Sequence, residues 1–383
     1  MNTVSRRHFL ESSLMCASLA AAGCATYGAT TAPSAKWNAS FETYKDEKTG
    51  ALVRRLTRSG KNTIVYQTHP QWANGMDFFL YYSDRSGTNR PHVLQLGTAE
   101  DRPLTQRPIS DLVLSWKQPL AYALSEGRLI ELDVPASFAG KDQGRELCAW
   151  PQEKLPSGSM FVSADHKTLY AGATIEPDKK WALLALDIAR AKWRTVVELE
   201  HQIGHVQANP VNPDLIMFCW ETGGDSPQRT WLVNSDGTGL RPCYKETYEE
   251  WVTHEVWWGS NEVLFTVWPY DDAHKAQPHG VFLYNVKSEK HIELYRMPAW
   301  HTHGSPDKRW VMADDFDRNL WLIEPKTRQR RLLTQGHKHA ALSVHPHASF
   351  TPDSRGIVFN SAKFGTADIL VVELPDWDSL PEV

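Results

Sequence analysis

Two histidine pairs near the C-terminal end of the chain have the residue types and spacing of metal ligands. His345 and His347 flank Pro346, and His301 and His303 lie upstream of them. Side chains at positions i and i+2 of an extended segment point to the same side, so the two imidazoles around the proline could hold one metal ion. His301 or His303 would supply a third nitrogen from a neighbouring strand. Such a site accepts zinc, manganese, nickel or iron, and the alternative is a structural histidine pair.

A second group of polar residues lies in strand-like segments in the middle of the chain. His254 and Glu255 form a polar pair inside an apolar run, and Arg229 precedes the apolar segment that begins at Trp231. The His254-Glu255 pair is a candidate for a catalytic role, with a strand-edge hydrogen bond as the alternative. Arg229 is either a charged active-site group or a surface ion-pair partner. Isolated histidines are usually structural, and we interpret five others in this way: His69, His92, His166, His274 and His291.

The elements that must position these residues are short strands that recur along the chain. A turn containing Asp, followed by an apolar strand, occurs at Ser163–Ala171, Ser305–Met312 and Thr351–Phe359. The apolar runs are short, rich in β-branched and aromatic residues and interrupted by turns, which excludes a helical fold. Similar units begin near residues 70, 112, 160, 208, 256, 304 and 349, and a period of about 40 residues is typical of four-stranded propeller blades.

We therefore predict an all-β fold, a seven-bladed β-propeller that spans residues 38–383. In this fold the segment 43–56 supplies an early strand that closes the ring by joining the final blade. The ring would bring residues that are far apart in the sequence together at one end of a central channel. The predicted metal ligands and the His254 region would meet there.

The N-terminal segment predicts export from the cytoplasm. Arg6 and Arg7 are followed by Phe and Leu, as in the twin-arginine pattern, and a run of small and apolar residues follows at 14–22. This run is too short to span a bilayer comfortably and is typical of an export signal. We predict that residues 1–24 form the signal and residues 25–37 a flexible lead-in.

Cys24 is a candidate site for a lipid anchor. Small residues precede it as in a lipobox, although Ala21 stands where leucine is usual. The alternative is ordinary signal-peptidase cleavage nearby. The predicted location is therefore the periplasm, or the outer membrane if Cys24 is lipidated.

Composition narrows the class of partner. The formal net charge of −4 does not indicate a nucleic-acid surface. Only Cys148, Cys219 and Cys243 follow the predicted signal, so we expect three buried thiols, with a Cys219–Cys243 disulfide as the alternative. The 16 tryptophans are expected to pack mainly between sheets, and the alternative for some of them is a sugar-binding platform.

Several of these residues belong to longer segments that occur in the same order in a known family. Together they resemble oligogalacturonate lyases, the propeller enzymes of polysaccharide lyase family 22, from about Phe41 to Pro375. The His-Pro-His and Thr-His-Glu segments are the most specific. The segments that carry the resemblance are Phe41–Asp46, Gly204-His205, Phe218–Glu221, Arg229–Gly237, Thr253–Glu255 and His345–Asp353.

The resemblance implies a metal site with one altered ligand. In that family three histidines and a glutamine hold a manganese ion at the centre of the propeller. His301, His345 and His347 match the three histidines, so the implied cofactor is a divalent metal, Mn²⁺. The position of the glutamine is occupied by Leu342, whose side chain cannot bind a metal. Water could complete the site, the site could be empty, or another histidine could compensate: His303, His337 or His339.

The resemblance also implies a reaction and the residues that perform it. His254 matches the catalytic base, Arg229 the catalytic arginine, and His205 a histidine that faces the substrate. The implied activity is a lyase reaction on 4-linked uronate oligosaccharides, such as oligogalacturonate, by metal-assisted β-elimination to 4,5-unsaturated products. Two other classes remain open: a non-catalytic propeller that binds a glycan or protein, and a metal-dependent hydrolase or isomerase on the same fold.

Overall fold

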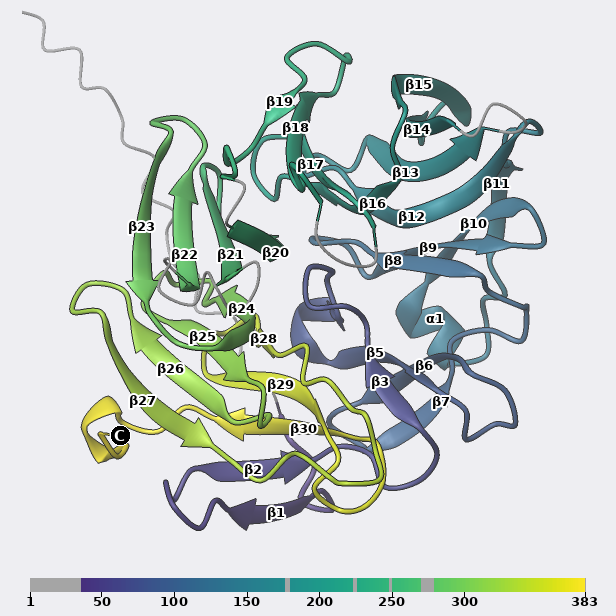
Figure 1. Ribbon diagram of the computed structural model, residues 1–383. Helices are drawn as coiled ribbons and strands as arrows, with labels where there is room; N and C mark the ends of the chain where they lie inside the picture. The colour runs from purple at the N-terminus through teal and green to yellow at the C-terminus, as the bar shows by residue number, and fades with distance from the viewer. Residues whose placement is uncertain (1–35, 176–179, 223–225, 248–249, 270–278, 383) are drawn as a thin grey trace, which may run out of the picture. The chain divides into compact units, whose positions relative to one another are not determined.

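Seven small antiparallel β-sheets follow one another along the chain as the blades of a propeller (Figure 1). The computed structural model describes residues 36–175, 180–222, 226–247, 250–269 and 279–382. The predicted export signal, Cys24 and His274 lie outside these residues. Within them, no helix has the length and apolar character needed to cross a membrane. The described helical segments are short: η1 (Asn74–Met76), α1 (Val134–Phe138) and η3 (Trp377–Ser379).

The first three blades are formed in sequence order. Blade 1 contains β3 (Asn62–Ile64), β5 (Phe78–Ser83), β6 (Arg90–Gln95) and β7 (Glu100–Pro103), with β4 (Trp72–Ala73) paired to β5. Blade 2 contains β8 (Asp111–Leu114), β9 (Leu120–Ser125), β10 (Arg128–Asp133) and β11 (Arg145–Ala149). Blade 3 contains β12 (Lys154–Val162), β13 (Thr168–Ile175), β14 (Lys180–Asp187) and β15 (Lys192–Leu199).

The next three blades repeat this order. Blade 4 contains β16 (Ile203–Ala208), β17 (Leu215–Trp220), β18 (Thr230–Asn234) and β19 (Arg241–Pro242). Blade 5 contains β20 (Glu250–Trp257), β21 (Glu262–Pro269), β22 (Gly280–Asn285) and β23 (Lys290–Tyr295). Blade 6 contains β24 (Ala299–Gly304), β25 (Val311–Asp315), β26 (Leu320–Glu324) and β27 (Gln329–Thr334).

Blade 7 is built from both ends of the described chain. Its C-terminal strands are β28 (Ser349–Phe350), β29 (Gly356–Ser361) and β30 (Asp368–Glu373), and the N-terminal strands β2 (Leu52–Arg55) and β1 (Glu42–Lys45) complete it. β2 pairs antiparallel with β30, with Arg54 opposite Val371. This confirms the predicted closure of the ring by the segment 43–56, and the fold is the predicted all-β, seven-bladed propeller.

The first strand of each blade lies innermost, and its backbone is irregular where the site forms. First strands of neighbouring blades contact one another, as β12 contacts β8 and β16, and β24 contacts β20 and β28. In blades 3 to 6 the register of this strand shifts near its start, which marks a β-bulge in each. The first strands of blades 3 to 6 begin several residues before the predicted starts of their units. The reason is that strand pairing continues on the N-terminal side of each bulge.

Three turns that were predicted to repeat adopt one local structure. In the β24–β25 turn the Ser305 hydroxyl donates to the Asp307 carboxylate at 2.7 Å, and Asp307 accepts the Arg309 N–H at 3.1 Å. Lys308, between them, has a φ of 65°. Such a turn suits a small hydroxyl residue with Asp two positions later. The equivalent residues are Ser163, Asp165 and His166 after β12, and Thr351, Asp353 and Ser354 after β28.

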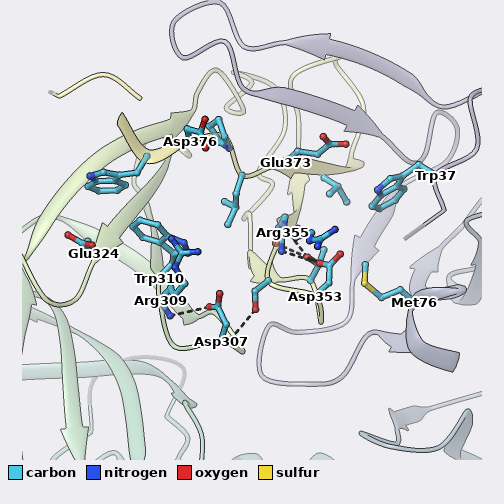
Figure 2. Close-up of a pocket in the computed structure, with 17 residues that line it drawn as sticks. Trp37, Met76, Asp307, Arg309, Trp310, Glu324, Asp353, Arg355, Glu373 and Asp376 are labelled. Atoms are coloured by element: carbon cyan, nitrogen blue, oxygen red, sulfur yellow. Dashed lines mark hydrogen bonds between the residues drawn. The ribbon is translucent and has the colours of Figure 1, made fainter. Parts of the chain in front are cut away.

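Two of these turns border a cavity of about 630 Å³ between blades 6 and 7 (Figure 2). Asp307 and Asp353 line it, but their carboxylates already serve their own turns. Glu373, also in the lining, pairs with Arg54 at 2.5 Å. These three carboxylates therefore stabilise the fold, and none of the predicted site residues lines this cavity.

The three cysteines in the described part of the chain form no disulfide. Cys148, Cys219 and Cys243 are all free thiols. Cys219 and Cys243 are buried as expected, whereas Cys148 is only partly buried because β11 is the outer strand of its blade. The Cys219–Cys243 alternative is therefore wrong.

Asp46, in the β1–β2 turn, joins the closing blade to blade 6. Its carboxylate accepts hydrogen bonds from the Thr334 hydroxyl at 3.0 Å and the Gln335 N–H at 2.9 Å. Burial alone would raise the pKa of Asp46, but these hydrogen bonds and one from the Thr49 N–H lower it overall. The stabilisation is therefore present above the unfolded pKa of Asp and is lost as the pH falls through the lower folded value.

We predict that Asp46→Ala lowers the free energy of unfolding by about 2 kcal/mol at neutral pH, because charged hydrogen bonds are lost. The difference from the parent chain should shrink as the pH falls below the unfolded pKa of Asp. Denaturant titration at several pH values measures this. Glu47→Ala, an exposed carboxylate in the same turn, is the control. A destabilisation that does not change with pH would contradict the prediction.

Candidate active site

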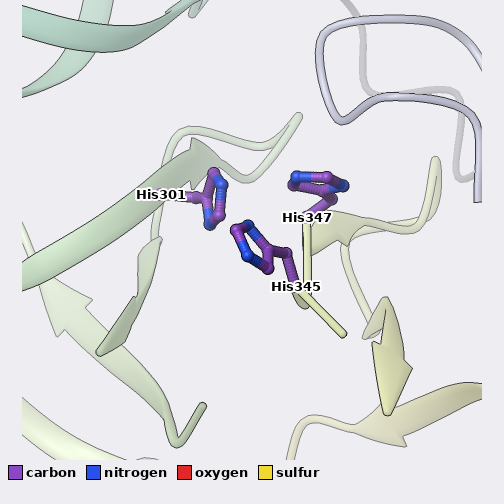
Figure 3. A group of neighbouring side chains, drawn as sticks. All are labelled: His301, His345 and His347. Atoms are coloured by element: carbon purple, nitrogen blue, oxygen red, sulfur yellow. The ribbon is translucent and has the colours of Figure 1, made fainter. Parts of the chain in front are cut away.

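His301, His345 and His347 meet as predicted (Figure 3). One imidazole nitrogen from each lies within 4.8 Å of those from the other two. His301 comes from β24, and the other two come from the segment that leads into β28. That segment is not an extended strand, because His347 has a φ of 43°, so the physical reason given for the pairing was wrong although the pairing itself occurs.

An acidic residue fixes the orientation of His301. The His301 Nδ1 lies 2.9 Å from an oxygen of Asp314, and the His301 backbone N–H donates to the same carboxylate at 2.5 Å. Asp314, on β25, is 0% exposed. With Nδ1 engaged by the carboxylate, Nε2 is the ring nitrogen left for the group of imidazoles, which is the usual arrangement of a metal-binding histidine. Sequence reasoning missed Asp314.

The two other imidazoles are held in the neutral form that metal binding needs. Burial, and then His301 and His345, lower the pKa of His347 to about 2. Burial, and then Arg318, lower the pKa of His345. A metal ligand must be deprotonated, so these three residues fit a divalent cation.

No other side chain among the described residues replaces the metal ligand that is missing at Leu342. The described residues add no fourth His, Cys, Asp or Glu to the group of three histidines. His337 is buried between the Thr334 and Ser361 hydroxyls, each at 3.0 Å. His339 is exposed, and His303 accepts the Phe350 N–H at 3.4 Å in another part of the channel. None of the three compensates for the leucine.

His254 lies against the group of three histidines. Its ring centroid is 4.2 Å from that of His301, and its Nδ1 is 3.4 Å from the Thr266 hydroxyl oxygen. The single Thr266 proton points to a backbone carbonyl, either of Thr253 or of Trp300, each at 3.1 Å, so the oxygen accepts from His254 Nδ1–H. The Nε2 lone pair of His254 is then available as a base.

The surroundings of His254 keep it neutral. Burial, followed by the nearby His301 and Arg229, lowers the pKa of His254 well below 6.5. At neutral pH the imidazole therefore carries no charge and can accept a proton. The bulge in β20 between Thr253 and Val256 places His254, at a φ of 56°, on this side of the strand.

Arg229 is not on the surface but is held inside by Glu255. Its Nε lies 3.0 Å from a Glu255 oxygen, and the two residues are 4% and 0% exposed. Burial alone would lower the pKa of Arg229, but Glu255 raises it overall, so the guanidinium stays charged. The surface ion-pair alternative is wrong. Glu255 is a positioning residue that sequence reasoning noted only as part of a polar pair.

His205 completes this side of the site. Its Nε2 lies 3.5 Å from a Glu221 oxygen and its Nδ1 lies 3.7 Å from a Glu255 oxygen. It sits in the bulge of β16 with a φ of 45°. The ring of Tyr66 lies between the rings of His205 and His347, with centroids 4.9 Å from each.

All six predicted site residues line one cavity of about 270 Å³. They are His205, Arg229, His254, His301, His345 and His347. Three tryptophans also line it, Trp251, Trp268 and Trp300, so part of the indole surface is available to a sugar ring as well as to packing. A charged arginine, a neutral base and a set of imidazoles that can hold a cation thus face one space.

The other histidines interpreted as structural lie outside this cavity where they are described. His69 and His92 are buried, and His69 lies 2.8 Å from the Thr68 hydroxyl. His166 lies in the turn after β12, and His291 is exposed on β23. Their places agree with the structural interpretation.

The fold and this cavity define a β-propeller with a histidine-lined candidate active site. No protein-family model matches the chain. The chain is 21% identical to the oligogalacturonate lyase of Dickeya dadantii, over 89% of this chain and 98% of that protein. The predicted resemblance to oligogalacturonate lyases is therefore confirmed.

Solved structures of oligogalacturonate lyases share the fold of this chain. The oligogalacturonate lyase of Vibrio parahaemolyticus superposes with a TM-score of 0.77 at 20% identity, over 88% of this chain and 97% of that one. An oligogalacturonate lyase in complex with manganese superposes with a TM-score of 0.78 at 21% identity, over 88% and 96% of the two chains.

We predict that Asp314→Asn weakens the binding of a divalent cation about 10–100-fold, because the carboxylate that orients His301 is lost. Calorimetric titration of the purified chain with Mn²⁺ measures this. Asp307→Asn, in the turn of the same hairpin, is the matched control and should bind the ion as the parent does. Equal Mn²⁺ affinity in Asp314→Asn and the parent would show that the Asp314 carboxylate does not support His301 as a metal ligand.

Proposed function

We infer that this chain is a lyase that cleaves 4-linked uronate oligosaccharides, with oligogalacturonate as the substrate class, by β-elimination. The observation that supports this proposal best is that all six predicted residues line one cavity. The similarity to oligogalacturonate lyases along almost the whole chain supports the same reaction class.

His301, His345 and His347 would hold a divalent cation, and we propose Mn²⁺ because a structural relative is described in complex with manganese. When bound, the ion would neutralise the carboxylate beside C5 of the sugar and stabilise the negative charge that develops there. Asp314 keeps the His301 ligand oriented.

His254 is proposed to remove the C5 proton through Nε2. Its Nδ1 is engaged with Thr266, and its low pKa keeps the imidazole neutral before the reaction. The electron pair of the C5–H bond then forms the C4–C5 double bond, and the C4–O bond breaks. The glycosidic oxygen leaves with the electron pair and takes up a proton, so no water is consumed.

Arg229 would bind the substrate carboxylate or the departing oxygen by charge-assisted hydrogen bonds. Its Nε is engaged with Glu255, which leaves the Nη groups as its available donors toward the cavity, although Nη2 also lies 3.7 Å from Glu221. His205, on the same side, is proposed to contact the sugar.

We also propose that the chain is exported by the twin-arginine route to the periplasm or outer membrane.

We predict that His254→Ala abolishes turnover while the fold is retained, because the proposed base is removed. The measurement is the ultraviolet absorbance of unsaturated ends formed from oligogalacturonate, with thermal unfolding as the check on the fold. His291→Ala, an exposed histidine on β23, is the matched control and should be fully active. Retained activity in His254→Ala would exclude the assignment.

Removal of divalent ions by a chelator should strongly lower the rate at which unsaturated ends form. Added Mn²⁺ should restore this rate, because the charge of the substrate carboxylate is then neutralised again. The same assay separates the classes of function. A lyase forms unsaturated ends, a hydrolase forms reducing ends without that absorbance, and a binding protein forms neither. Turnover that is insensitive to the chelator would contradict a role for the ion.

A further inference from the structure

A second cavity continues from the candidate active site. It has a volume of about 610 Å³, within the range of ligand pockets, and it shares His345 and His347 with the active-site cavity as lining residues. Its other lining residues come from β3 and Lys61 just before it, the β5–β6 turn, β29, the β29–β30 turn and the segment before His345, so it lies where blade 1 meets blade 7. The two imidazoles thus form a wall common to both cavities.

The lining of this second cavity is polar and partly unengaged. Lys61, Asn89 and Ser343 are exposed in it, and among the described residues their side chains have no hydrogen-bond or ion-pair partner. Asn62 is 1% exposed, and its Oδ1 is buried without a donor. The exposed side chains of Lys61, Asn89 and Ser343 supply the kinds of donor and acceptor that a sugar requires.

Hydrogen bonds connect the lining of the second cavity to the segment that carries His345 and His347. Asn360, in its lining, donates to the His345 carbonyl at 3.0 Å and accepts the Ile64 N–H at 2.8 Å. The one carboxylate in the lining, Asp84, accepts the Lys61 backbone N–H at 2.7 Å. Asp84 is therefore engaged with the backbone, whereas the Lys61 ammonium has no counter-ion among the described residues.

We propose that this second cavity binds the sugar next to the one that reacts, with Lys61 in contact with the carboxylate of that neighbouring uronate. The inference rests on the proposed function, because it takes the same oligosaccharide as the ligand. An oligo-uronate carries one carboxylate on every ring, so a substrate that crosses the histidine wall presents a second anion to the cavity that holds Lys61. The catalytic cavity has the aromatic and metal-binding groups, and the second cavity has the hydrogen-bonding groups and the free cation.

The test is the binding of trigalacturonate to Lys61→Met, measured by calorimetry with Mn²⁺ present. Both this variant and its parent carry His254→Ala, so that the ligand is not consumed. Lys61→Met should weaken binding about three- to fivefold, as expected for one exposed ion pair, and the difference should shrink at high salt. Fully methyl-esterified trigalacturonate, which lacks the charges, should bind Lys61→Met and the parent equally.

Lys192→Met, which removes an exposed lysine at the start of β15, is the matched control and should bind trigalacturonate as the parent does. The proposal is overturned if Lys61→Met leaves trigalacturonate binding unchanged, if it weakens the ester to the same extent, or if the parent binds no trigalacturonate. Failure of the proposed function is distinguishable from these results. A chain without the His254 change that binds trigalacturonate through Lys61 but forms no unsaturated ends would retain this subsite and lose the lyase assignment.

Discussion

The pairing of β2 with β30 is the contact on which the site depends, because it makes the first and last blades neighbours. Tyr66 follows β3 of blade 1, and His347 precedes β28 of blade 7, yet their rings lie 4.9 Å apart. Arg55 stabilises the pairing through Asp368, at 2.8 Å, and Asp368 is fully buried. Loss of Arg55 would leave the buried Asp368 carboxylate with the Thr366 hydroxyl as its remaining side-chain partner, which is destabilising.

The irregular backbone of the innermost strands gives the site its composition. His254 and Glu255 lie in the bulge of β20 and contact opposite neighbours: His254 reaches His301 of blade 6, and Glu255 engages Arg229 of blade 4. His205, His254 and His347 all have positive φ, a conformation that costs about 1–3 kcal/mol for a non-glycine residue and persists where packing enforces it.

The blades, and the six residues that line one cavity, could be predicted from the sequence. The contacts that hold those six side chains in place could not. The turns with Asp and the apolar runs between them are local patterns, so the blades and their order followed directly. Asp314 was missed because its meeting with His301 depends on the register of β24 against β25, which the bulge shifts. The burial of Arg229 was missed for a similar reason, since its partner Glu255 belongs to the next blade.

Completing blade 7 with strands from both ends of the chain has a consequence for synthesis. The strands β1 and β2 leave the ribosome first and must wait for β30 before they can pair, so the ring stays open until translation is nearly finished. Contacts between such distant segments form slowly because a long loop must close. For the proposed export by the twin-arginine route, which carries folded proteins, the last blade to be translated would set the moment at which the chain is ready to leave the cytoplasm.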